Sequence, residues 1–591
     1  MPERDQIDRN ILTDKPLTIQ ESTMDECRNR ILSDDYADFI IEFSDYPGIA
    51  EKNHELPCEQ GLPGRFSFVH VPREGMTIMD LLSYKYYSIP KLYGLMQVTA
   101  SDAANATKLQ NQPSLTLKGQ GVIVGFIDTG INYQHKAFRY TTGETRIDAI
   151  WDQTIQSDKV PSGFYYGTEY LKADIDEALR SDDPYSIVPS RDDNGHGTFM
   201  AGVAAGSQDI QNDFIGAAPE ATIAMVKLKP AKSYLRDLFL INEGTQAYQE
   251  NDIMLAIDYL VGLGIRLKKP VVIMLGAGTN QGNHTGRSPL GYVLNNLSTA
   301  VGFGVVIAGG NEGNKRHHYH GTFLSDIGYT GYNEVEINVG KNENGFTVEL
   351  WGNAPEIFSV SIVSPTGETY PRIPAELERV EEVHFLFDPT VIYVSYEIVE
   401  VRTGDQLILM NFRNPSEGIW RVRVYGSNVN TGNFHMWLPI ETFVNDDTVF
   451  MDPNPYTTLT EPSNAFYPIT VSGYNSVTSG AFPESGRGFA MDNSIKPNFA
   501  APAMDVLGPN LRDGYTVRNG TSIAAAITAG CTAQFIGWDI VHNGKPTMST
   551  IDAKNYWIRG ARRVAGTVYP NREVGFGTLD AFNAFEVLLQ R

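Results

Sequence analysis

The chain has 591 residues, of which 42% are hydrophobic and 20% are charged, and its formal net charge is -23. This length exceeds that of one ordinary domain and predicts two or three domains with a large buried core. The strong negative charge argues against nucleic acid or an anionic membrane as a partner, because both would repel the protein.

The N-terminus and the cysteines bear on where the protein resides. The first ten residues lack the apolar core of a secretory signal, and no uninterrupted apolar run reaches membrane-spanning length. The three cysteines, Cys27, Cys58 and Cys531, are too few and too uneven in number for a disulfide framework. We therefore expect no signal peptide, no membrane partner and a reducing, cytoplasmic location.

Residues 1–97 carry mixed strand and helix signals. Residues 36–44 are rich in apolar residues and predict a strand, and residues 79–83 predict part of a short helix. We expect a compact α+β segment here, followed by the first part of a second domain at residues 98–325.

An apolar run dense in β-branched residues, residues 120–128, predicts a buried parallel strand. It places Asp128 at the carboxyl end of that strand, and Thr129 and Gly130 then turn the chain away. In open α/β sheets, ligands bind beyond the carboxyl ends of the strands. Asp128 is therefore expected where chemistry takes place.

Two further motifs follow along the chain. Gly195 and Gly197 bracket His196 and permit a tight turn, and the small residues after them predict a helix with His196 in its first turn. Asn311 follows another apolar strand and a pair of glycines. Its side-chain amide is a candidate hydrogen-bond donor.

From about Gly331 the sequence consists of short runs in which apolar and polar residues alternate, with Gly, Asn and Pro between the runs. Period-two alternation of this kind predicts an antiparallel β-sandwich, for which we favour a jelly roll, inserted at residues 326–462. The predicted strands are residues 335–339, 346–351, 358–363, 391–398, 406–410 and 419–425.

The second domain resumes at residues 463–591, beginning with a predicted strand at residues 467–473. Gly520 precedes Ser522, and small residues from Ile523 to Gly530 predict a buried helix. A serine at the N-terminus of such a helix gains a favourable dipole.

One Asp, one His and one Ser are what nucleophilic hydrolysis by a serine requires. A hydroxyl becomes a good nucleophile only when a base takes its proton, and imidazole serves as that base when a carboxylate holds its other nitrogen. Donors must also face the developing oxyanion, typically one backbone N–H and one side-chain amide. Asp128, His196, Ser522 and Asn311 together satisfy this requirement.

Each motif alone has a simpler interpretation. Asp-Thr-Gly also opens turns and occurs in aspartic proteases, Ser and Thr before a helix are usually N-caps, and Asn311 alone is more typical of a turn. Their joint occurrence beside strands and helices of the right kind favours catalysis. An α/β-hydrolase esterase is disfavoured, because no Gly-x-Ser-x-Gly elbow surrounds Ser522.

In this order, the motifs resemble those of the subtilisin-like serine proteases. The resemblance implies an α/β fold with a parallel sheet and helices on both faces, and an endopeptidase activity. It identifies Asp128 as the orienting carboxylate, His196 as the general base, Ser522 as the nucleophile and Asn311 as the oxyanion amide. One departure is Ala526, which stands where the family has a proline and should alter packing more than chemistry.

The resemblance also implies two substrate-binding segments. The first pairs with the bound peptide as an extended edge, and the second lines the pocket for the residue before the scissile bond. Their residues are Leu275, Gly276, Ala277 and Gly278 in the first, and Ala308, Gly309 and Gly310 in the second.

A narrower resemblance is to the clostridial Csp-type germination proteases, through residues 89–93, residues 109–113 and the long insertion that follows residues 304–313. It implies that residues 1–97 are a prodomain that is cleaved near Met96-Gln97-Val98, with Gln97 donating the carbonyl, and that then inhibits the enzyme. Tyr87-Ser88 is a second candidate site, and an uncleaved accessory domain is the simpler alternative.

The same resemblance implies limited cleavage of a protein zymogen in spore germination and a spore-associated location. Some members of the group have lost triad residues and act as signalling pseudoproteases, whereas all triad positions are filled here. Two other classes stay open: a prodomain-locked or signalling pseudoprotease, and a binding protein that acts through the sandwich.

No cofactor is assigned from the sequence. Residues 208–213 lie where many relatives hold calcium, and their Asp and Asn oxygens suit that ion, but polar surface loops of this composition are common. Residues 317–320, His-His-Tyr-His, could bind a transition metal, yet a solvated loop at the insertion junction is the more typical interpretation.

Overall fold

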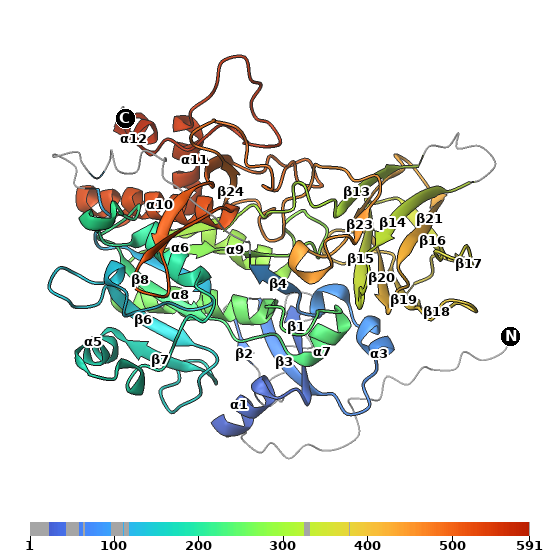
Figure 1. Ribbon diagram of the computed structural model, residues 1–591, viewed down its shortest axis with the longest axis horizontal. Coiled ribbons are helices and arrows are strands. Elements are labelled where there is room, and N and C mark those ends of the chain that lie inside the picture. Colours follow the sequence, from blue (N-terminus) through green and yellow to red (C-terminus); the bar gives the residue numbers. More distant parts are fainter. Residues whose placement is uncertain are drawn as a thin grey trace.

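The structure is a computed structural model that describes residues 23–42, 58, 60–62, 65–95, 110, 117–323, 331–377 and 379–589. Figure 1 shows three parts that lie against one another. They are an N-terminal segment (blue), an α/β domain (mostly green and red) and a β-sandwich (yellow and orange) at one end of the molecule. The α/β domain is built from two stretches of chain, one before and one after the sandwich.

An eight-stranded sheet forms the centre of the α/β domain. Neighbouring strands are parallel except for the last pair, which is antiparallel. The inner strands are apolar and buried on both faces, as expected for a parallel sheet. In sheet order they are β25 (Phe499–Pro502), β24 (Ile469–Tyr474), β12 (Phe303–Ala308), β10 (Val271–Leu275), β5 (Ile123–Asp128), β8 (Thr222–Lys227), β6 (Ile147–Asp152) and β7 (Thr168–Leu171).

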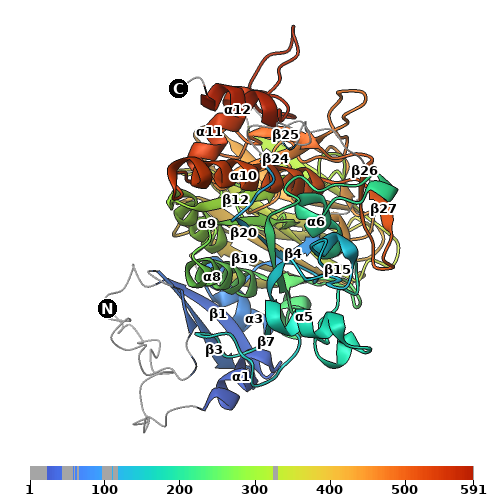
Figure 2. The same ribbon diagram turned by 90° about the vertical axis from the view of Figure 1, so that its left-hand side faces the viewer.

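Helices cover both faces of this sheet, as predicted. One apolar cluster joins α6 and α10 to Val124, Val272 and Val306, and another joins α8 and α9 to Ile273 and Ile307. Figure 2 shows α10, α11 and α12 on the side of the molecule opposite the N-terminal segment. The helices are α5 (Lys172–Arg180), α6 (His196–Ala205), α7 (Ser233–Leu238), α8 (Glu250–Leu267), α9 (Pro289–Thr299), α10 (Thr521–Asn543), α11 (Thr550–Gly560) and α12 (Ala581–Leu589).

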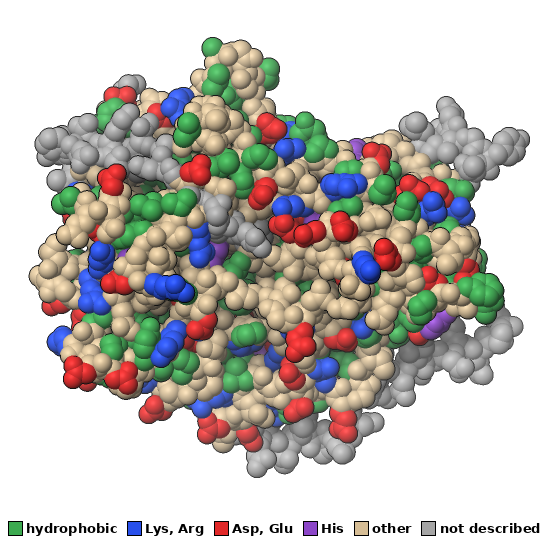
Figure 3. Space-filling model, viewed as in Figure 1, with side chains coloured by type: hydrophobic (Ala, Val, Ile, Leu, Met, Phe, Trp, Pro, Cys, Tyr) green, Lys and Arg blue, Asp and Glu red, His purple; other side chains and the backbone are tan. Residues whose placement is uncertain are grey.

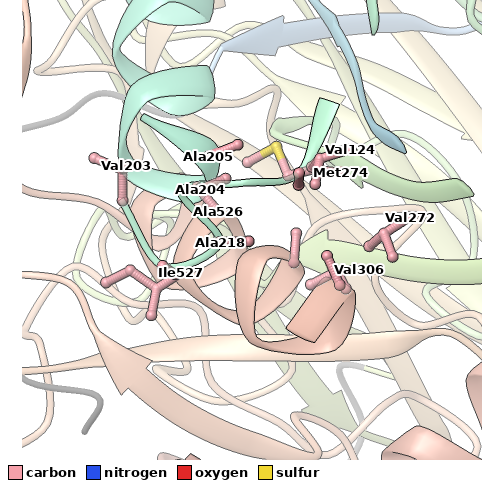
Figure 4. Packing of buried hydrophobic residues seen from close by; sticks show 14 of the residues in the cluster. Val124, Val203, Ala204, Ala205, Ala218, Val272, Met274, Val306, Ala526 and Ile527 are labelled. Atoms are coloured by element: carbon pink, nitrogen blue, oxygen red, sulfur yellow. The ribbon is translucent and has the colours of Figure 1, made fainter. Parts of the chain in front are cut away.

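Small residues allow α6 and α10 to approach closely. Figure 4 shows Ala204 and Ala205 of α6 near Ala526 and Ile527 of α10. A Cβ atom at Gly530 would lie 2.5 Å from the carbonyl oxygen of Ala204, so only glycine fits there. Among the described helices, α10 alone is long and apolar enough to cross a membrane, but 89% of its apolar stretch is buried inside the protein.

The N-terminal segment combines helices with a three-stranded antiparallel sheet. Its predicted strand and helix are both present, and Phe66 packs edge-on against Tyr292 of α9 with 5.6 Å between ring centres. The segment therefore rests on the α8–α9 side of the central sheet. Its elements are α1 (Met24–Leu32), β1 (Tyr36–Glu42), β2 (Gln60–Gly61), β3 (Phe66–Pro72), α3 (Ile78–Ser83) and a 3₁₀ turn, η2 (Tyr86–Ser88).

The expectation for the cysteines is wrong in one respect. A disulfide joins Cys27 of α1 to Cys58, 31 positions further along the chain, and Cys531 is a free, buried thiol in α10. An odd number of cysteines excludes complete pairing, but it does not exclude a single bridge.

The insert folds as two antiparallel sheets around one apolar core, and all six predicted strands are present. The six-stranded sheet is β13 (His318–Thr322), β22 (Asn433–Trp437), β15 (Gly345–Gly352), β20 (Gln406–Arg413), β19 (Val391–Glu397) and β18 (Val380–His384). The five-stranded sheet is β17 (Thr369–Ile373), β16 (Ile357–Val363), β21 (Gly418–Asn428), β14 (Asn333–Val339) and β23 (Val449–Phe450).

The histidine tract is part of this sandwich, so the prediction of a solvated loop there is wrong. His318 begins β13 and is buried, its ring stacks on Trp437 at 4.8 Å, and its Nε2 lies 2.9 Å from Nδ1 of His435. The sandwich consequently begins before the predicted boundary at residue 326. The pairing with β22, more than 100 residues away, supplies the partners that the local sequence does not show.

The three parts meet at a buried contact that we call the seam. It contains Tyr86 and Lys91 from the N-terminal segment, Glu250 from α8, and Glu349 and Trp351 from the sandwich. The Tyr86 hydroxyl donates to Glu349 at 2.6 Å, its ring packs edge-on against Trp351, and the Glu250 N–H donates to the Lys91 carbonyl at 2.9 Å. The N-terminal segment is thus held by both of the other parts.

Charged side chains of both signs occur on the one face of the molecule that Figure 3 shows. On the face shown in Figure 3, Asp and Glu side chains (red) are interspersed with Lys and Arg side chains (blue). On this face the net charge of -23 therefore does not gather in one patch.

Candidate active site

Asp128 and His196 meet where β5 ends and α6 begins. His196 Nδ1 lies 2.8 Å from each carboxylate oxygen of Asp128, and both side chains are buried. The Thr129 N–H also donates to Asp128 Oδ1 at 2.7 Å, which fixes the carboxylate at the strand end. The carboxylate holds one ring nitrogen, so the opposite nitrogen, Nε2, is the one left to act as a base.

The glycines around His196 have the role that the sequence suggested. Gly195 adopts a left-handed conformation with φ of +87° at the start of α6. A Cβ atom at Gly197 would collide with the Gly130 carbonyl oxygen and lie 3.1 Å from Asp128 Oδ1. A side chain at Gly197 would therefore push α6 away from the carboxylate that orients His196.

Asp192 is a functional residue that the sequence argument missed. Its buried carboxylate accepts from the Gly195 N–H at 2.8 Å, the Thr198 N–H at 2.9 Å and the Thr129 hydroxyl at 2.8 Å. It joins the end of β5 to the first turn of α6 and so positions His196. The signal was available, because an acidic residue just before a helix satisfies its free N–H groups.

Ser522 lies in the first turn of α10 and is fully buried. Its hydroxyl donates to the Gly276 carbonyl oxygen at 3.2 Å. A Cβ atom at Gly276 would lie 3.3 Å from Ser522 Oγ and 3.3 Å from His196 Cε1. The serine hydroxyl and the imidazole ring therefore converge on one point, and α6, α10 and the end of β10 meet there.

The orientation of the Asn311 amide is set by the residue before the serine. Asn311 Oδ1 accepts from the Thr521 N–H at 3.1 Å and from the Thr521 hydroxyl at 2.9 Å, and that hydroxyl accepts from the Gly310 N–H at 3.1 Å. A backbone N–H can only donate, so the atom facing Thr521 must be the oxygen. The NH₂ end of the amide is then the donor end, as an oxyanion hole requires.

The first predicted substrate segment forms a strand edge that is already occupied. β11 (Ala277–Gly278) pairs antiparallel with β4 (Leu92–Leu95) of the N-terminal segment, with Gly278 opposite Gly94. On its other side β4 pairs with β9 (Tyr248–Gln249), so the N-terminal segment supplies the middle strand of a three-stranded sheet. In Figure 1, β4 is drawn near the middle of the molecule, between the α/β domain and the sandwich.

The other predicted substrate residues are divided between groove and core. The side chain of Leu275 packs in the apolar cluster under α8 and α9, so only its backbone borders the groove. Ala308 and Gly309 continue from β12 toward Gly310, which has φ of +90°.

Thr460, which the sequence argument missed, closes this end of the groove. A Cβ atom at Gly310 would lie 2.6 Å from Thr460 Cγ2, and one at Gly278 would collide with Thr460 Oγ1. The next residue, Glu461, is buried beside the groove, and burial raises the pKa of its carboxyl to about 7. Both residues follow the sandwich in sequence, so no local motif marks them.

Of the two predicted cleavage sites, the structure describes only the second. Gln97 and Val98 fall outside the described residues. Tyr87 and Ser88 belong to η2, where the Tyr87 ring is buried against Tyr86, so this bond lies within a folded turn.

The residues present do not form an evident metal site. In the part of the chain that the structure describes, no three His, Cys, Asp or Glu side chains gather as a metal would need. In the loop proposed for calcium, Asp209 pairs with Lys136 at 2.7 Å and accepts from the Gln211 N–H at 3.1 Å. Its carboxylate is therefore already paired with other groups of the protein.

Comparisons with known proteins agree with this geometry. The profile of the Subtilase family matches residues 119–372 and 429–577. The solved structure of the CspB protease of Clostridium perfringens superposes with a TM-score of 0.73 and 31% identity, covering 83% of this chain and 98% of that one.

Two curated proteinases of lactic acid bacteria also match. The PII-type proteinase of Lacticaseibacillus paracasei is 23% identical over 256 residues, which is 43% of this chain and 12% of that proteinase. The PI-type proteinase of Lactococcus lactis subsp. cremoris is 23% identical over 321 residues, which is 52% of this chain and 15% of that proteinase. The matching regions thus span a small part of these relatives.

Proposed function

Because this chain belongs to the subtilase family of serine proteases, we propose that it is an endopeptidase with Ser522 as its nucleophile. One observation carries the proposal: the Ser522 hydroxyl and the His196 ring converge at Gly276, with Asp128 behind the imidazole. Serine hydrolysis requires this combination of nucleophile, base and orienting carboxylate.

The geometry supports a two-stage reaction. His196 Nε2 takes the proton of Ser522 as Oγ attacks the substrate carbonyl carbon, and the carbonyl π electrons move to oxygen. The Asn311 NH₂ and the Ser522 backbone N–H stabilise that oxyanion. His196 then gives its proton to the leaving amine as the C–N bond breaks. Water repeats the sequence on the acyl-enzyme and releases the acid.

We further propose that residues 1–97 are a prodomain that the enzyme cleaves from itself near Met96-Gln97-Val98. The support is the register of β4: Gly94 lies opposite Gly278 and Leu95 opposite Ala277, so the last described residue of β4 lies opposite the neighbour of Gly276. Self-cleavage leaves the segment seated as an intramolecular inhibitor.

The substrate that we propose is a protein zymogen, cut at one or a few sites during spore germination, in a cytoplasmic or spore-associated location. The support is the resemblance of the sequence to the Csp-type proteases and the similarity to the CspB protease structure. The insert is proposed to be a jelly roll that serves packing and rigidity. Nucleic acid and membranes are not proposed as partners, in keeping with the charge of -23.

A specific observation favours a second candidate, a protease that stays locked by its N-terminal segment. β4 occupies the groove, and the side chains of Leu92 and Tyr93 are fully buried. In this form the triad is assembled, but no substrate reaches Ser522 until the segment is displaced.

The test is the intact mass and N-terminal sequence of the wild type and of Ser522→Ala, produced side by side. We expect a new N-terminus between Gln97 and Thr99 in the wild type only. Thr528→Ala, on the same helix with its hydroxyl bonded to the Ala524 carbonyl, serves as the control and should be processed like the wild type.

The chemical state of Ser522 separates the two candidates. Labelling of wild-type Ser522 by a fluorophosphonate supports the open enzyme, and processing without labelling supports the locked form. Full-length wild type that is not labelled even after the N-terminal segment has been digested away contradicts the proposed endopeptidase.

A further inference from the structure

The groove position that Gly94 fills is closed by side chains of the sandwich insert. A Cβ atom at Gly94 would lie 2.5 Å from Ile440 Cδ1, 2.8 Å from Thr442 Oγ1 and 3.3 Å from Phe443 Cε1. Contacts under 3.0 Å essentially do not occur at real Cβ atoms, so any side chain here requires the surrounding residues to move.

The two apolar side chains among these three are held by packing. Ile440 and Phe443 are buried in the apolar cluster that also contains Leu92 and Trp351. Ile440 precedes the short 3₁₀ turn η6 (Glu441–Phe443), Phe443 ends it, and the Glu441 N–H donates to Glu312 at 2.9 Å. Glu312 directly follows Asn311, so the turn is anchored beside the oxyanion amide.

The two positions before Gly94 hold large side chains. Leu92 and Tyr93 have fully buried side chains, so the groove holds one large apolar and one large aromatic residue just before Gly94. The closure is therefore specific to one position and does not reflect a groove that is narrow throughout.

We propose that Ile440, Thr442 and Phe443 are specificity-determining residues that restrict the substrate position opposite Gly278 to glycine. The inference rests on the proposed endopeptidase function and names the class of its substrate: extended protein segments in which an apolar and an aromatic residue precede a glycine, as in Leu92-Tyr93-Gly94. The insert thus acts directly on the choice of substrate, besides packing against the α/β domain.

The first test is self-processing of full-length variants, followed by intact mass over time. Gly94→Ala should be processed about ten-fold more slowly than the wild type, the scale expected when one methyl group overpacks a tight site. Gly61→Ala is the matched control in the same segment, because its Cβ would meet nothing closer than 3.8 Å.

Removing the atoms that obstruct a side chain at position 94 distinguishes a steric restriction from a general folding defect. Ile440→Val with Thr442→Ala deletes the two closest atoms, so Gly94→Ala in that background should regain most of its lost rate. Gly94→Ala processed at the wild-type rate, or a combined variant no faster than Gly94→Ala alone, overturns the inference.

A second measurement does not depend on catalysis. In the Ser522→Ala protein, hydrogen exchange of residues 92–95 should become faster with Gly94→Ala and return toward the reference value when the two deletions are added. If the wild type never cleaves itself and Ser522 is not labelled even after the segment has been digested away, but this exchange pattern holds, the proposed function fails and the restriction stands. An unchanged exchange rate with Gly94→Ala counts against the restriction whatever the activity.

A third measurement uses substrate in trans. Processed enzyme from which the N-terminal segment has been digested away should cleave a fluorogenic peptide with the sequence of residues 90–97 about ten-fold faster, in kcat/KM, than the same peptide with alanine at the Gly94 position. The Ile440→Val, Thr442→Ala enzyme should lose that discrimination, and equal rates in the unmodified enzyme would contradict the proposal.

Discussion

The active site and the seam differ in whether short sequence motifs mark the residues that form them. At the active site, each reacting group follows the end of a strand or begins a helix, and short motifs such as Asp128-Thr-Gly and Gly-His196-Gly set its position. At the seam, Lys91 meets Glu250 and Tyr86 meets Glu349, which are 159 and 263 positions apart. No local pattern announces either pair.

The two regions also differ in their electrostatics. In the active site the charged groups are paired and share hydrogen bonds. In the seam, burial lowers the pKa of Lys91 to about 8, and burial raises the pKa of the Glu250 and Glu349 carboxyls despite that cation. The residues of the active site can thus be recognised from short sequence motifs. The residues of the seam have no such motif, and burial disfavours their charged forms.

The largest effect is expected from Lys91→Met. Removing the ammonium leaves the buried Tyr86 and Ile89 carbonyls without the donor that they share, and it takes away the cation that favours the buried Glu250 and Glu349 carboxylates. Each hydrogen bond to a charged group is worth about 1.5–3 kcal/mol. The N-terminal segment should detach at lower urea concentration, as read by hydrogen exchange of β1 and β3. Lys85→Met, an exposed lysine of the same segment, should leave the midpoint unchanged; equal midpoints for both variants would show that the seam does not depend on its cation.

In the active site, Asn311→Ala should lower the rate of the reaction without lowering the stability of the fold. Loss of one oxyanion donor lowers kcat by roughly 10²–10³-fold, about 3–4 kcal/mol. KM should change little, because the donor acts on charge that develops only in the transition state. The measurement is steady-state cleavage of a peptide by processed enzyme; a rise in KM at constant kcat would place Asn311 in ground-state binding instead.

The histidines of the sandwich junction predict a pH dependence. Burial first, and then the nearby His284 and His320, lower the pKa of His318 to about 3, although the Asn454 carbonyl acts to raise it. Between pH 6.5 and 4.5 an unfolded chain would bind a proton that folded His318 refuses, so stability falls as the pH falls, by about 3 kcal/mol across that window.

His318→Gln should flatten this dependence in thermal unfolding measured from pH 7 to pH 4.5. His384→Gln, an exposed histidine of β18, is the control and should retain the wild-type slope. The two variants must be compared with each other because buried carboxyls change stability with pH in the opposite direction. Burial raises the pKa of Glu461 to about 7, so this group lowers stability as the pH rises from about 4.5 to 7.

The smallest expected effect belongs to Asp192→Asn. The variant keeps the size of the side chain and weakens its charge-assisted hydrogen bonds to the first turn of α6, worth about 1.5 kcal/mol. If Asp192 positions His196, kcat/KM should fall by about ten-fold and the pH profile of kcat should shift. A loss of thermal stability with an unchanged pH profile would make its role purely structural.

Much of the α/β domain could be predicted from the sequence, because parallel strands are continuous apolar runs and their carboxyl ends carry the motifs. Asp128, His196, Ser522 and Asn311 could be named for the same reason. The sandwich strands were visible from their alternation. In each case the signal lies within a few residues.

What could not be predicted depends on distant partners. Thr460 closes the groove only because the chain returns there after the sandwich, and His318 is buried only because β22 pairs with β13. The Cys27–Cys58 bridge likewise requires knowing that α1 lies beside residue 58. Contacts between residues so far apart in the chain depend on the fold and produce no periodic pattern in the sequence.

The parallel pairing of β12 with β24 has a consequence for how this architecture could arise. The chain leaves the sheet after Ala308 and returns in the adjacent strand at Ile469, with Ile307 opposite Thr470. To the parent sheet, the whole sandwich is one long loop between neighbours, and the entropic cost of closing a loop grows only slowly with its length. A complete domain could therefore be acquired, enlarged or exchanged at this point while the catalytic framework kept its register.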